Sequence, residues 1–268
     1  MAERFGAWEL ERLIAVGGTA EVWRTLDANG RAVALKRLHT HLMRNDEARA
    51  LFATETRVAT VLPRHPSVVH AAAAGDVDTR PWLALEMAPG VTLRQLVSPA
   101  PTRDDASPAA TRIKLEHAMR VVAAAADGAA HLHGEGWVHG DINPGNLVVD
   151  GAEVVVIDLG VARRAGDGGT VRGTHAYMAP EQVRGEAWTP ATDVFALGVV
   201  LWELVAGARL FHRGPPWLSM AAVVEYTPAP LADARADAIA RAALAKDPAA
   251  RLASASELAS RLRELASN

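Results

Sequence analysis

The sequence contains no cysteine, so disulfide bonds and thiolate zinc sites are excluded. No apolar run reaches the length needed to cross a bilayer, and the N-terminal M-A-E-R-F lacks the pattern of a signal peptide. The net charge of −3 gives no electrostatic footprint for nucleic acid or for an anionic membrane. We therefore expect a cytoplasmic protein with no nucleic-acid partner and no membrane segment in this chain.

Lysine is also scarce, because only 3 of the 28 basic residues are lysines. One of them, Lys36, lies in the apolar run V-A-L-K, where a buried strand is expected. A compact ammonium suits a point contact with phosphate oxygens, whereas arginine would bring a larger fork. Lys36 is therefore a candidate phosphate ligand.

Strand patterns fill the first part of the chain. Three apolar runs between residues 8 and 38 are separated by the turns G-G-T at 17–19 and A-N-G at 28–30. The first turn offers backbone N–H groups without bulky side chains, which a loop covering phosphates requires. Two further strands are predicted over 68–75 and 81–87, and the run A-P-G at 88–90 marks a boundary between two lobes.

Residues 45–62 have helical periodicity, and Glu55 falls within their apolar stripe. A buried carboxylate needs a cationic partner, and Lys36 is the candidate. Beyond residue 90 the pattern is helical, with a long helix over 111–134 and others over 190–206, 217–225, 232–245 and 254–265. We expect a mobile loop over 98–108 and a flexible basic loop after Gly160.

A hairpin is predicted in the middle of the chain, with strands Leu147–Val149 and Val154–Ile157 joined by D-G-A-E. Asp141 and Asn146 precede its first strand, and Asp158 follows its second. Two carboxylates and an amide at one end of a small sheet suit Mg²⁺ bound together with substrate phosphates. An ordinary surface hairpin with polar ends is the alternative at this point.

Taken in order, these motifs resemble those of the protein kinase family, most closely bacterial Ser/Thr kinases of eukaryotic type. The matching segments run along the whole chain: G-G-T-A-E-V, V-A-L-K, the helix with Glu55, H-G-D-I-N-P-G-N, D-L-G, G-T-H-A-Y-M-A-P-E, T-D-V-F-A-L-G and K-D-P-A-A-R-L. The resemblance implies an α+β, two-lobed fold. Residues 1–87 would form a small antiparallel sheet with one helix, and 88–268 a larger, mainly helical lobe.

The resemblance also implies a role for each site residue in an ATP- and Mg²⁺-dependent transfer to a protein hydroxyl. Asp141 would accept the hydroxyl proton, Lys36 would bind phosphates, Glu55 would orient Lys36, and Thr174 would lie beside Asp141. Asn146 and Asp158 would bind the metal. The nucleotide would be contacted by Ile14, Gly17, Gly18, Val22, Ala34, Lys36, Leu85, Glu86, Ala88 and Val148. Asp193 would brace the catalytic loop, and Glu181 would pair with Arg251.

The sequence departs from the family pattern at four positions. Ala15 and Ala20 replace the first and third glycines of the glycine-rich loop. Gly140 replaces the arginine of H-R-D, and Asn143 replaces the lysine that helps to neutralise the γ-phosphate. We therefore expect modest activity. Without that arginine, phosphorylation of Thr170 should have little effect on activity. A protein activator, a homodimer or the substrate would have to order the loop between Asp158 and Glu181.

Two other functions stay open. A pseudokinase would bind nucleotide and act as an interaction module, as Asn143 and the altered glycine loop suggest. A small-molecule phosphotransferase resembling aminoglycoside kinases would share H-G-D and the asparagine five residues later. Those relatives lack the segment G-T-H-A-Y-M-A-P-E and the Glu181/Arg251 pair, which disfavours this alternative.

Overall fold

The computed structural model describes residues 3–97, 114–169 and 171–267. They divide into two compact units. The first comprises the chain up to His65 together with Val69–Ala88 and Asp158–Val161, and the second comprises Pro66–Val68, Pro89–Ile157 and the chain from Ala162 onward. Asp158–Val161 therefore lies in the first unit, although it follows the boundary at 88–90 by about 70 residues. The mixture of strands and helices confirms the α+β class.

Strands dominate the first half of the chain and helices the second. The strands are β1 (Glu3–Phe5), β2 (Trp8–Leu10), β3 (Arg12–Val16), β4 (Ala20–Leu26), β5 (Ala32–Leu38), β6 (Ala71–Val77), β7 (Arg80–Glu86), β8 (Val91–Thr92), β9 (Trp137–Val138), β10 (Leu147–Asp150), β11 (Glu153–Val156) and β12 (Arg163–Arg164). The helices are α1 (Asp46–Val61), α2 (Leu93–Val97), α3 (Leu115–Gly134), α4 (Pro180–Val183), α5 (Pro190–Ala206), α6 (Pro216–Glu225), α7 (Ala234–Ala243) and α8 (Ala255–Ala266). Three single 3₁₀ turns are η1 (Thr40–Leu42), η2 (His175–Tyr177) and η3 (Pro248–Ala250).

The first unit is built on an antiparallel sheet with the strand order β3-β4-β5-β7-β6. Because side chains alternate along each strand, the pairing register decides which residues share a face. Leu35 pairs with Ala84, and both join Phe5 and Leu10 in a small apolar core on one face. Lys36 is the next residue along β5, so it projects from the opposite face.

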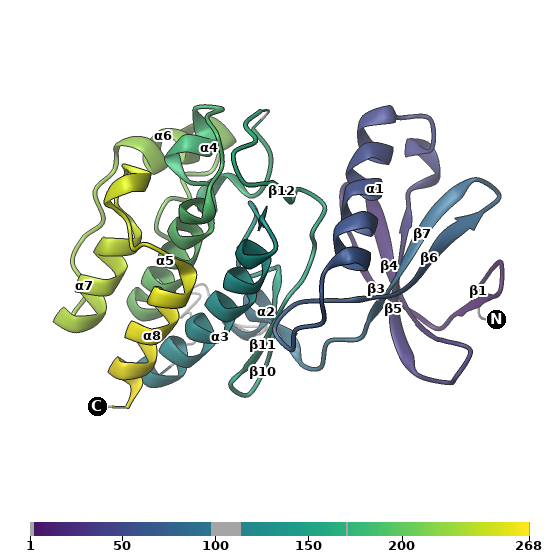
Figure 1. Ribbon diagram of the computed structural model, residues 1–268, viewed down its shortest axis with the longest axis horizontal. Coiled ribbons are helices and arrows are strands. Elements are labelled where there is room, and N and C mark those ends of the chain that lie inside the picture. Colours follow the sequence, from purple (N-terminus) through teal and green to yellow (C-terminus); the bar gives the residue numbers. More distant parts are fainter. Residues whose placement is uncertain (1–2, 98–113, 170, 268) are drawn as a thin grey trace, which may run out of the picture. The chain divides into compact units, whose positions relative to one another are not determined.

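Helix α1 carries Glu55 and lies against the sheet (Figure 1). Asn45 caps its first turn by accepting a hydrogen bond from the Ala48 amide at 2.8 Å, and Asp46 and Glu47 add favourable negative charge there. The predicted stripe is buried at Ala48, Phe52, Glu55, Val58 and Ala59. The periodicity of 45–62 therefore predicted both the helix and its buried face correctly.

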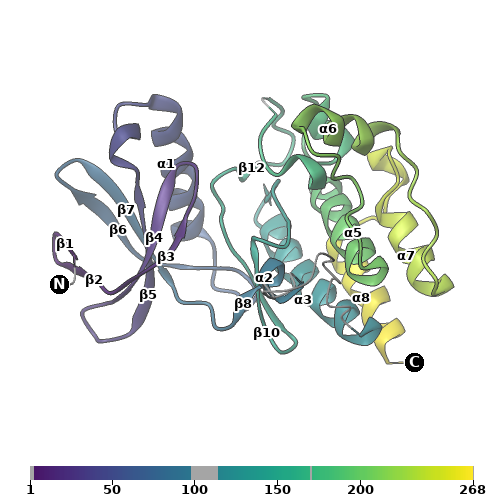
Figure 2. The ribbon, with the colours of Figure 1, turned by 180° about the vertical axis from the view of Figure 1, so that it is seen from behind.

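The second unit has one extended core to which α3, α5, α7 and α8 contribute (Figure 2). Helix α5 is buried along most of its length and ends at Gly207, which has a φ of 67°. Gly128 lets α3 approach the chain at Ser67, because a Cβ there would lie 2.5 Å from the Ser67 carbonyl oxygen. The hairpin β10–β11 pairs Leu147 with Val156, as the sequence predicted.

Some predicted boundaries and one predicted loop differ from the structure. Strand β6 begins at Ala71 instead of 68, because Val68 forms a parallel bridge with Val156. The expectation of a flexible loop after Gly160 was wrong at its start, since Arg163 and Arg164 form β12 and pair with β9. Helix α2 was not predicted. The loop expected over 98–108 and the candidate phosphorylation site Thr170 lie outside the described residues.

Candidate active site

The Lys36 ammonium lies between two carboxylates within the first unit. Its Nζ donates to Glu55 Oε1 at 2.8 Å and to Asp158 Oδ1 at 2.9 Å. The Lys36 and Glu55 side chains are only 12% and 4% exposed, whereas that of Asp158 is 46% exposed. The predicted partnership of Lys36 with Glu55 is therefore present, and the same ammonium also binds Asp158.

Burial and charge act against each other in this group. Burial alone would lower the pKa of Lys36, but the carboxylates of Glu55 and Asp158 raise it above its usual value. Burial raises the pKa of Glu55 to about 7, although the Lys36 ammonium favours the ionised form. The ammonium is thus held charged and fixed in position, as a phosphate ligand requires.

Asp158 has a left-handed backbone conformation, with a φ of 64°. This conformation is uncommon for residues other than glycine, although aspartate tolerates it better than most. Asp158 lies two residues after the end of β11. An exposed carboxylate on a strained turn, with one oxygen bound by Lys36, is a suitable cation ligand.

Three of the predicted nucleotide-binding residues of the first unit, Val22, Ala34 and Leu85, lie in the same sheet as Lys36. Strand pairing puts Val22 opposite Lys36 and Ala34 opposite Leu85. These four residues share the sheet face that carries the ammonium. The face therefore offers small or branched apolar side chains beside a fixed cation.

The turn between β3 and β4 contains Gly17 and Gly18. Gly17 donates its N–H to the Ala20 carbonyl at 2.8 Å, and its own carbonyl contacts His39 Nε2 at 2.8 Å. A Cβ at Gly18 would meet no atom within 4 Å, so the turn is open at that residue. Ile14, on β3, is 38% exposed.

Two predicted backbone ligands lie at the end of β7 and just beyond it. Glu86 donates its N–H to the His70 carbonyl at 2.9 Å, so this amide is already engaged. The expectation that the Glu86 backbone contacts adenine can therefore hold only through its carbonyl oxygen. Ala88, two residues on, is half-buried.

Asp141, Asn146 and Thr174 are brought together within the second unit. Asp141 Oδ1 accepts a 2.7 Å hydrogen bond from the Thr174 backbone N–H. Asn146 Nδ2 donates to Asp141 Oδ2 at 3.1 Å and to the Asp141 carbonyl at 2.9 Å. The carboxylate is thus oriented from both oxygens, and the amide carbonyl oxygen is the atom that Asn146 can offer to a cation. Val148, in β10 of the same unit, is 9% exposed.

Asp193 holds the backbone that carries Asp141. Its carboxylate accepts from the His139 and Gly140 amides, each at 2.8 Å, and contacts His133 Nε2 at 2.8 Å. Burial would raise the pKa of Asp193, but the hydrogen bonds from His133 and the backbone keep it below its usual value. The predicted bracing role of Asp193 is therefore what the geometry provides.

The side chain of Asn143 is directed into its own loop and is 2% exposed. Its Nδ2 donates to the Asp141 carbonyl at 3.0 Å, and its Oδ1 accepts from the Gly145 amide at 2.9 Å and from Arg94 at 3.0 Å. A buried amide with these partners organises the loop. It is not a free substitute for a lysine ammonium.

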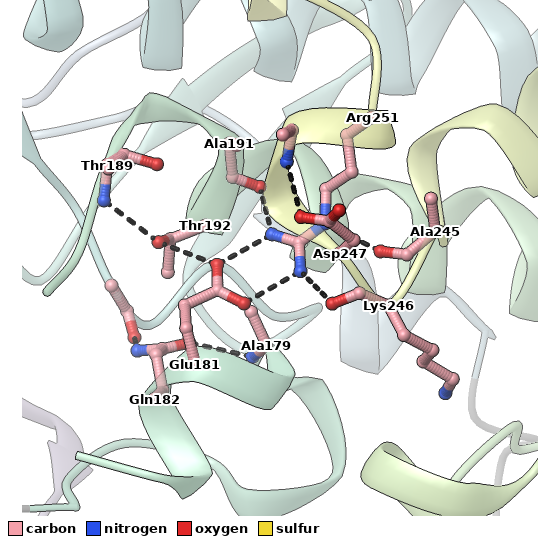
Figure 3. Close-up of polar contacts among 12 residues, drawn as sticks. Ala179, Glu181, Gln182, Thr189, Ala191, Thr192, Ala245, Lys246, Asp247 and Arg251 are labelled. Atoms are coloured by element: carbon pink, nitrogen blue, oxygen red, sulfur yellow. Dashed lines mark hydrogen bonds and ion pairs between the residues drawn. The ribbon is translucent and has the colours of Figure 1, made fainter. Parts of the chain in front are cut away.

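Glu181 and Arg251 form the predicted pair in the second unit (Figure 3). The guanidinium donates to both carboxylate oxygens, at 2.6 and 2.7 Å, and Thr192 Oγ1 donates to Glu181 Oε1 at 3.0 Å. Arg251 also donates to the carbonyls of Ala191 and Ala245. The pair joins the chain before α5 to the chain before α8, 70 residues apart.

The sequence did not predict two polar residues, Gln182 and Arg94, that hold the loop containing Gly140 and Asn143. Gln182 donates from Nε2 to the Gly140 carbonyl at 2.8 Å and accepts the Ala179 amide at 2.9 Å. Arg94 reaches Asn143 from α2, whose five residues gave no clear periodic signal. Their positions depend on tertiary contacts that no local spacing encodes. The adjacency of Gln182 to Glu181 was the available hint.

The described residues contain no group of three or more His, Asp or Glu side chains arranged to hold a metal on their own. In the same part of the chain, no helix is both long and apolar enough to traverse a bilayer.

A protein kinase domain model matches residues 8–261. A probable serine/threonine-protein kinase of Corynebacterium efficiens is 32% identical over 97% of this chain and 41% of its own length. Serine/threonine-protein kinase PknB of Mycobacterium tuberculosis is 31% identical over 94% of this chain and 41% of its own length. Serine/threonine-protein kinase PknA of the same species is 32% identical over 77% of this chain and 48% of its own length. The chain thus spans less than half the length of these curated relatives.

Proposed function

The chain belongs to the protein kinase family, and from this premise we propose that it transfers the γ-phosphate of ATP to a serine or threonine hydroxyl of a protein. The observation that carries the proposal is the Lys36 ammonium fixed by Glu55 and Asp158 at 2.8 and 2.9 Å. A buried ammonium beside an exposed carboxylate suits a nucleotide phosphate and its accompanying cation.

In this mechanism Lys36 binds the α- and β-phosphates and Glu55 keeps its ammonium in place. Val22, Ala34, Leu85 and Val148 contact the purine, and the turn at Gly17 and Gly18 covers the phosphates. Asp141 accepts the hydroxyl proton, since hydrogen bonds from Thr174 and Asn146 fix both its oxygens.

Mg²⁺ would be held by the Asp158 carboxylate and the Asn146 amide oxygen, and it would neutralise charge on the transferred phosphoryl group. Both residues offer hard oxygen donors, and the Asn146 amide nitrogen is already used by Asp141. Asn143 carries no ammonium, and its amide is already bound by the Asp141 carbonyl, Gly145 and Arg94, so we expect a modest rate of transfer. The need for ATP favours a cytoplasmic location.

A pseudokinase is the second candidate, and the buried Asn143 is the observation that favours it. In that case the chain would bind nucleotide without transferring phosphate. The buried Glu181–Arg251 pair disfavours the third possibility, a small-molecule phosphotransferase, because the relatives of aminoglycoside kinases lack this pair.

Calorimetry of ATP binding with Mg²⁺ and with chelator tests the nucleotide site. Lys36→Met and Asp158→Asn should weaken binding, and Asp158→Asn should also abolish the advantage of Mg²⁺. Asp78→Asn is the control for Asp158→Asn, because Asp78 is exposed and also has a positive φ, of 48°. Equal affinity with metal and with chelator would refute the assigned metal ligands.

The acceptor is tested by supplying labelled ATP with a generic protein substrate, with an aminoglycoside or with choline. Label in the protein alone supports the proposal. Label in the small molecule supports the third candidate, and nucleotide binding without any transfer supports the second.

A further inference from the structure

An aromatic ring occupies the place where a side chain at Gly140 would project. A Cβ at Gly140 would lie 2.1 Å from Cζ3 of Trp188, and Gly140 has a φ of +75°. Both the space and the backbone therefore exclude other residues without a shift. Trp188 is fully buried, and in the described part of the chain its Nε1 has no hydrogen-bond partner. Packing, not a hydrogen bond, holds this ring.

The guanidinium of Arg163 lies over the same ring, 3.6 Å from its centroid. This is a close cation–π contact between a half-buried guanidinium and a fully buried ring. Arg163 also donates from a terminal nitrogen to the Gly168 carbonyl at 3.0 Å. One side chain thus connects the Trp188 ring with the chain at both 163 and 168.

The backbone of Trp188 holds the same segment. Its N–H donates to the Asp167 carbonyl at 3.0 Å, and its carbonyl accepts from the Gly166 amide at 2.8 Å. The Ala165 amide donates to the Gly136 carbonyl at 3.1 Å, and β12 pairs with β9 just before it. Residues 163–167 are therefore fastened both to the chain just before the catalytic loop and to Trp188.

Gly140 is held on three sides. The Trp188 ring packs against it, its N–H binds Asp193 at 2.8 Å, and its carbonyl binds Gln182 at 2.8 Å. The next residue is Asp141. A change at the ring would therefore be transmitted to the carboxylate through one peptide unit.

We propose that Trp188 is a positioning residue, which fixes Asp141 and residues 163–169 in one arrangement without any phosphorylated side chain. In relatives with H-R-D, the arginine binds a phosphorylated residue of this loop through charge-assisted hydrogen bonds. Here Gly140 has no side chain to donate a hydrogen bond, and the stack of Gly140, Trp188 and Arg163 takes over that ordering role. The inference rests on the proposed function only in naming Asp141 as the catalytic residue.

Hydrogen exchange on the phosphatase-treated chain tests this directly. The amides of Ala165, Gly166 and Trp188 should be protected equally in the parent before and after phosphatase treatment and in Thr170→Ala. Trp188→Ala should speed exchange in peptides covering 138–142 and 163–169 by at least about tenfold, with α8 unchanged. Trp188→Phe keeps an aromatic ring but loses the outer indole atoms that meet Gly140, so its exchange rates should lie between those of the parent and of Trp188→Ala.

One further variant and two controls keep the test decisive if Trp188→Ala unfolds. Arg163→Gln retains the ring and should speed exchange within 163–169, whereas Arg261→Gln, an exposed arginine on α8, should not. Trp217→Ala removes a tryptophan that is 65% exposed and should leave both peptides unchanged.

Kinetics supply the second readout. Because Trp188 acts through Asp141 and not through Lys36, Trp188→Ala should lower kcat roughly 10- to 100-fold while the KM for ATP changes by less than about twofold. Protection that arises only after phosphorylation, or unchanged exchange in both Trp188→Ala and Arg163→Gln, would overturn the inference. If the parent transfers no phosphate, the proposed function fails, and the exchange data still decide the role of Trp188.

Discussion

Removing the charge of Glu181 should be among the most destabilising single changes in the second unit. Arg251 has a side chain that is 0% exposed and Glu181 one that is 2% exposed. In Glu181→Gln the guanidinium would stay buried with only carbonyl and amide oxygens as partners. Breaking a buried pair in this way costs about 3–5 kcal/mol of unfolding free energy.

Replacing the other partner of the pair gives an independent check. Arg251→Met leaves the Glu181 carboxylate buried with the Thr192 hydroxyl, and we expect a similar loss. The double variant Glu181→Met/Arg251→Met removes both charges and should cost clearly less than the two single losses added together. Arg120→Gln is the control, because the Arg120–Glu116 pair has side chains 55% and 58% exposed. Such exposed pairs contribute about 0.3–0.5 kcal/mol.

Urea unfolding measures these differences. At an m-value of about 3 kcal/mol per M, the expected loss in Glu181→Gln shifts the midpoint by roughly 1–2 M. A midpoint shift no larger than that of Arg120→Gln would mean that Arg251 is not desolvated in the folded chain. Additive losses in the double variant would equally show that the two charges do not depend on each other.

Two further predictions concern Asn143 and Lys246. Asn143→Lys should not raise kcat, and it should cost about 1–3 kcal/mol of stability, because the buried amide that binds the Asp141 carbonyl is lost; a variant that is faster and equally stable would contradict this. Burial and the charges of Arg251 and Arg184 lower the pKa of Lys246 to about 8. The unfolded chain then holds the proton more tightly, so stability should rise as pH increases from about 8 toward the unfolded pKa near 10.5. Thermal melts across this range should lose that rise in Lys246→Met, and an identical slope in the variant would show that another group titrates.

Periodicity and burial were enough to predict one part of the site. The stripe over 45–62 put Glu55 on the buried face of a helix, and a lone lysine on a buried strand was its natural partner. The hairpin with Leu147 and Val156 was likewise evident from two apolar runs around a turn. In both cases the signal is local in sequence and repeats with a known period.

The remaining parts depend on contacts between distant residues. Nothing near Gly140 in the sequence indicates that the ring of Trp188, 48 positions later, occupies the space where a side chain at residue 140 would lie. The resemblance placed Thr174 beside Asp141, but the structure shows that the contact uses the backbone N–H. The sequence shows that Asn143 lacks the charge of the lysine it replaces, but only the structure shows that its amide binds the Asp141 carbonyl, the Gly145 amide and Arg94.

Labelled ATP with a generic protein substrate tests whether Asp141 accepts a proton during transfer of phosphate from ATP. The parent should label the substrate, and Asp141→Ala should lower the rate by at least about 100-fold at saturating ATP, the upper part of the range for general bases being about 10⁴-fold. ATP affinity should be unchanged, because Asp141 is not among the residues proposed to bind the nucleotide or the metal. Equal labelling by the parent and by Asp141→Ala would contradict the account.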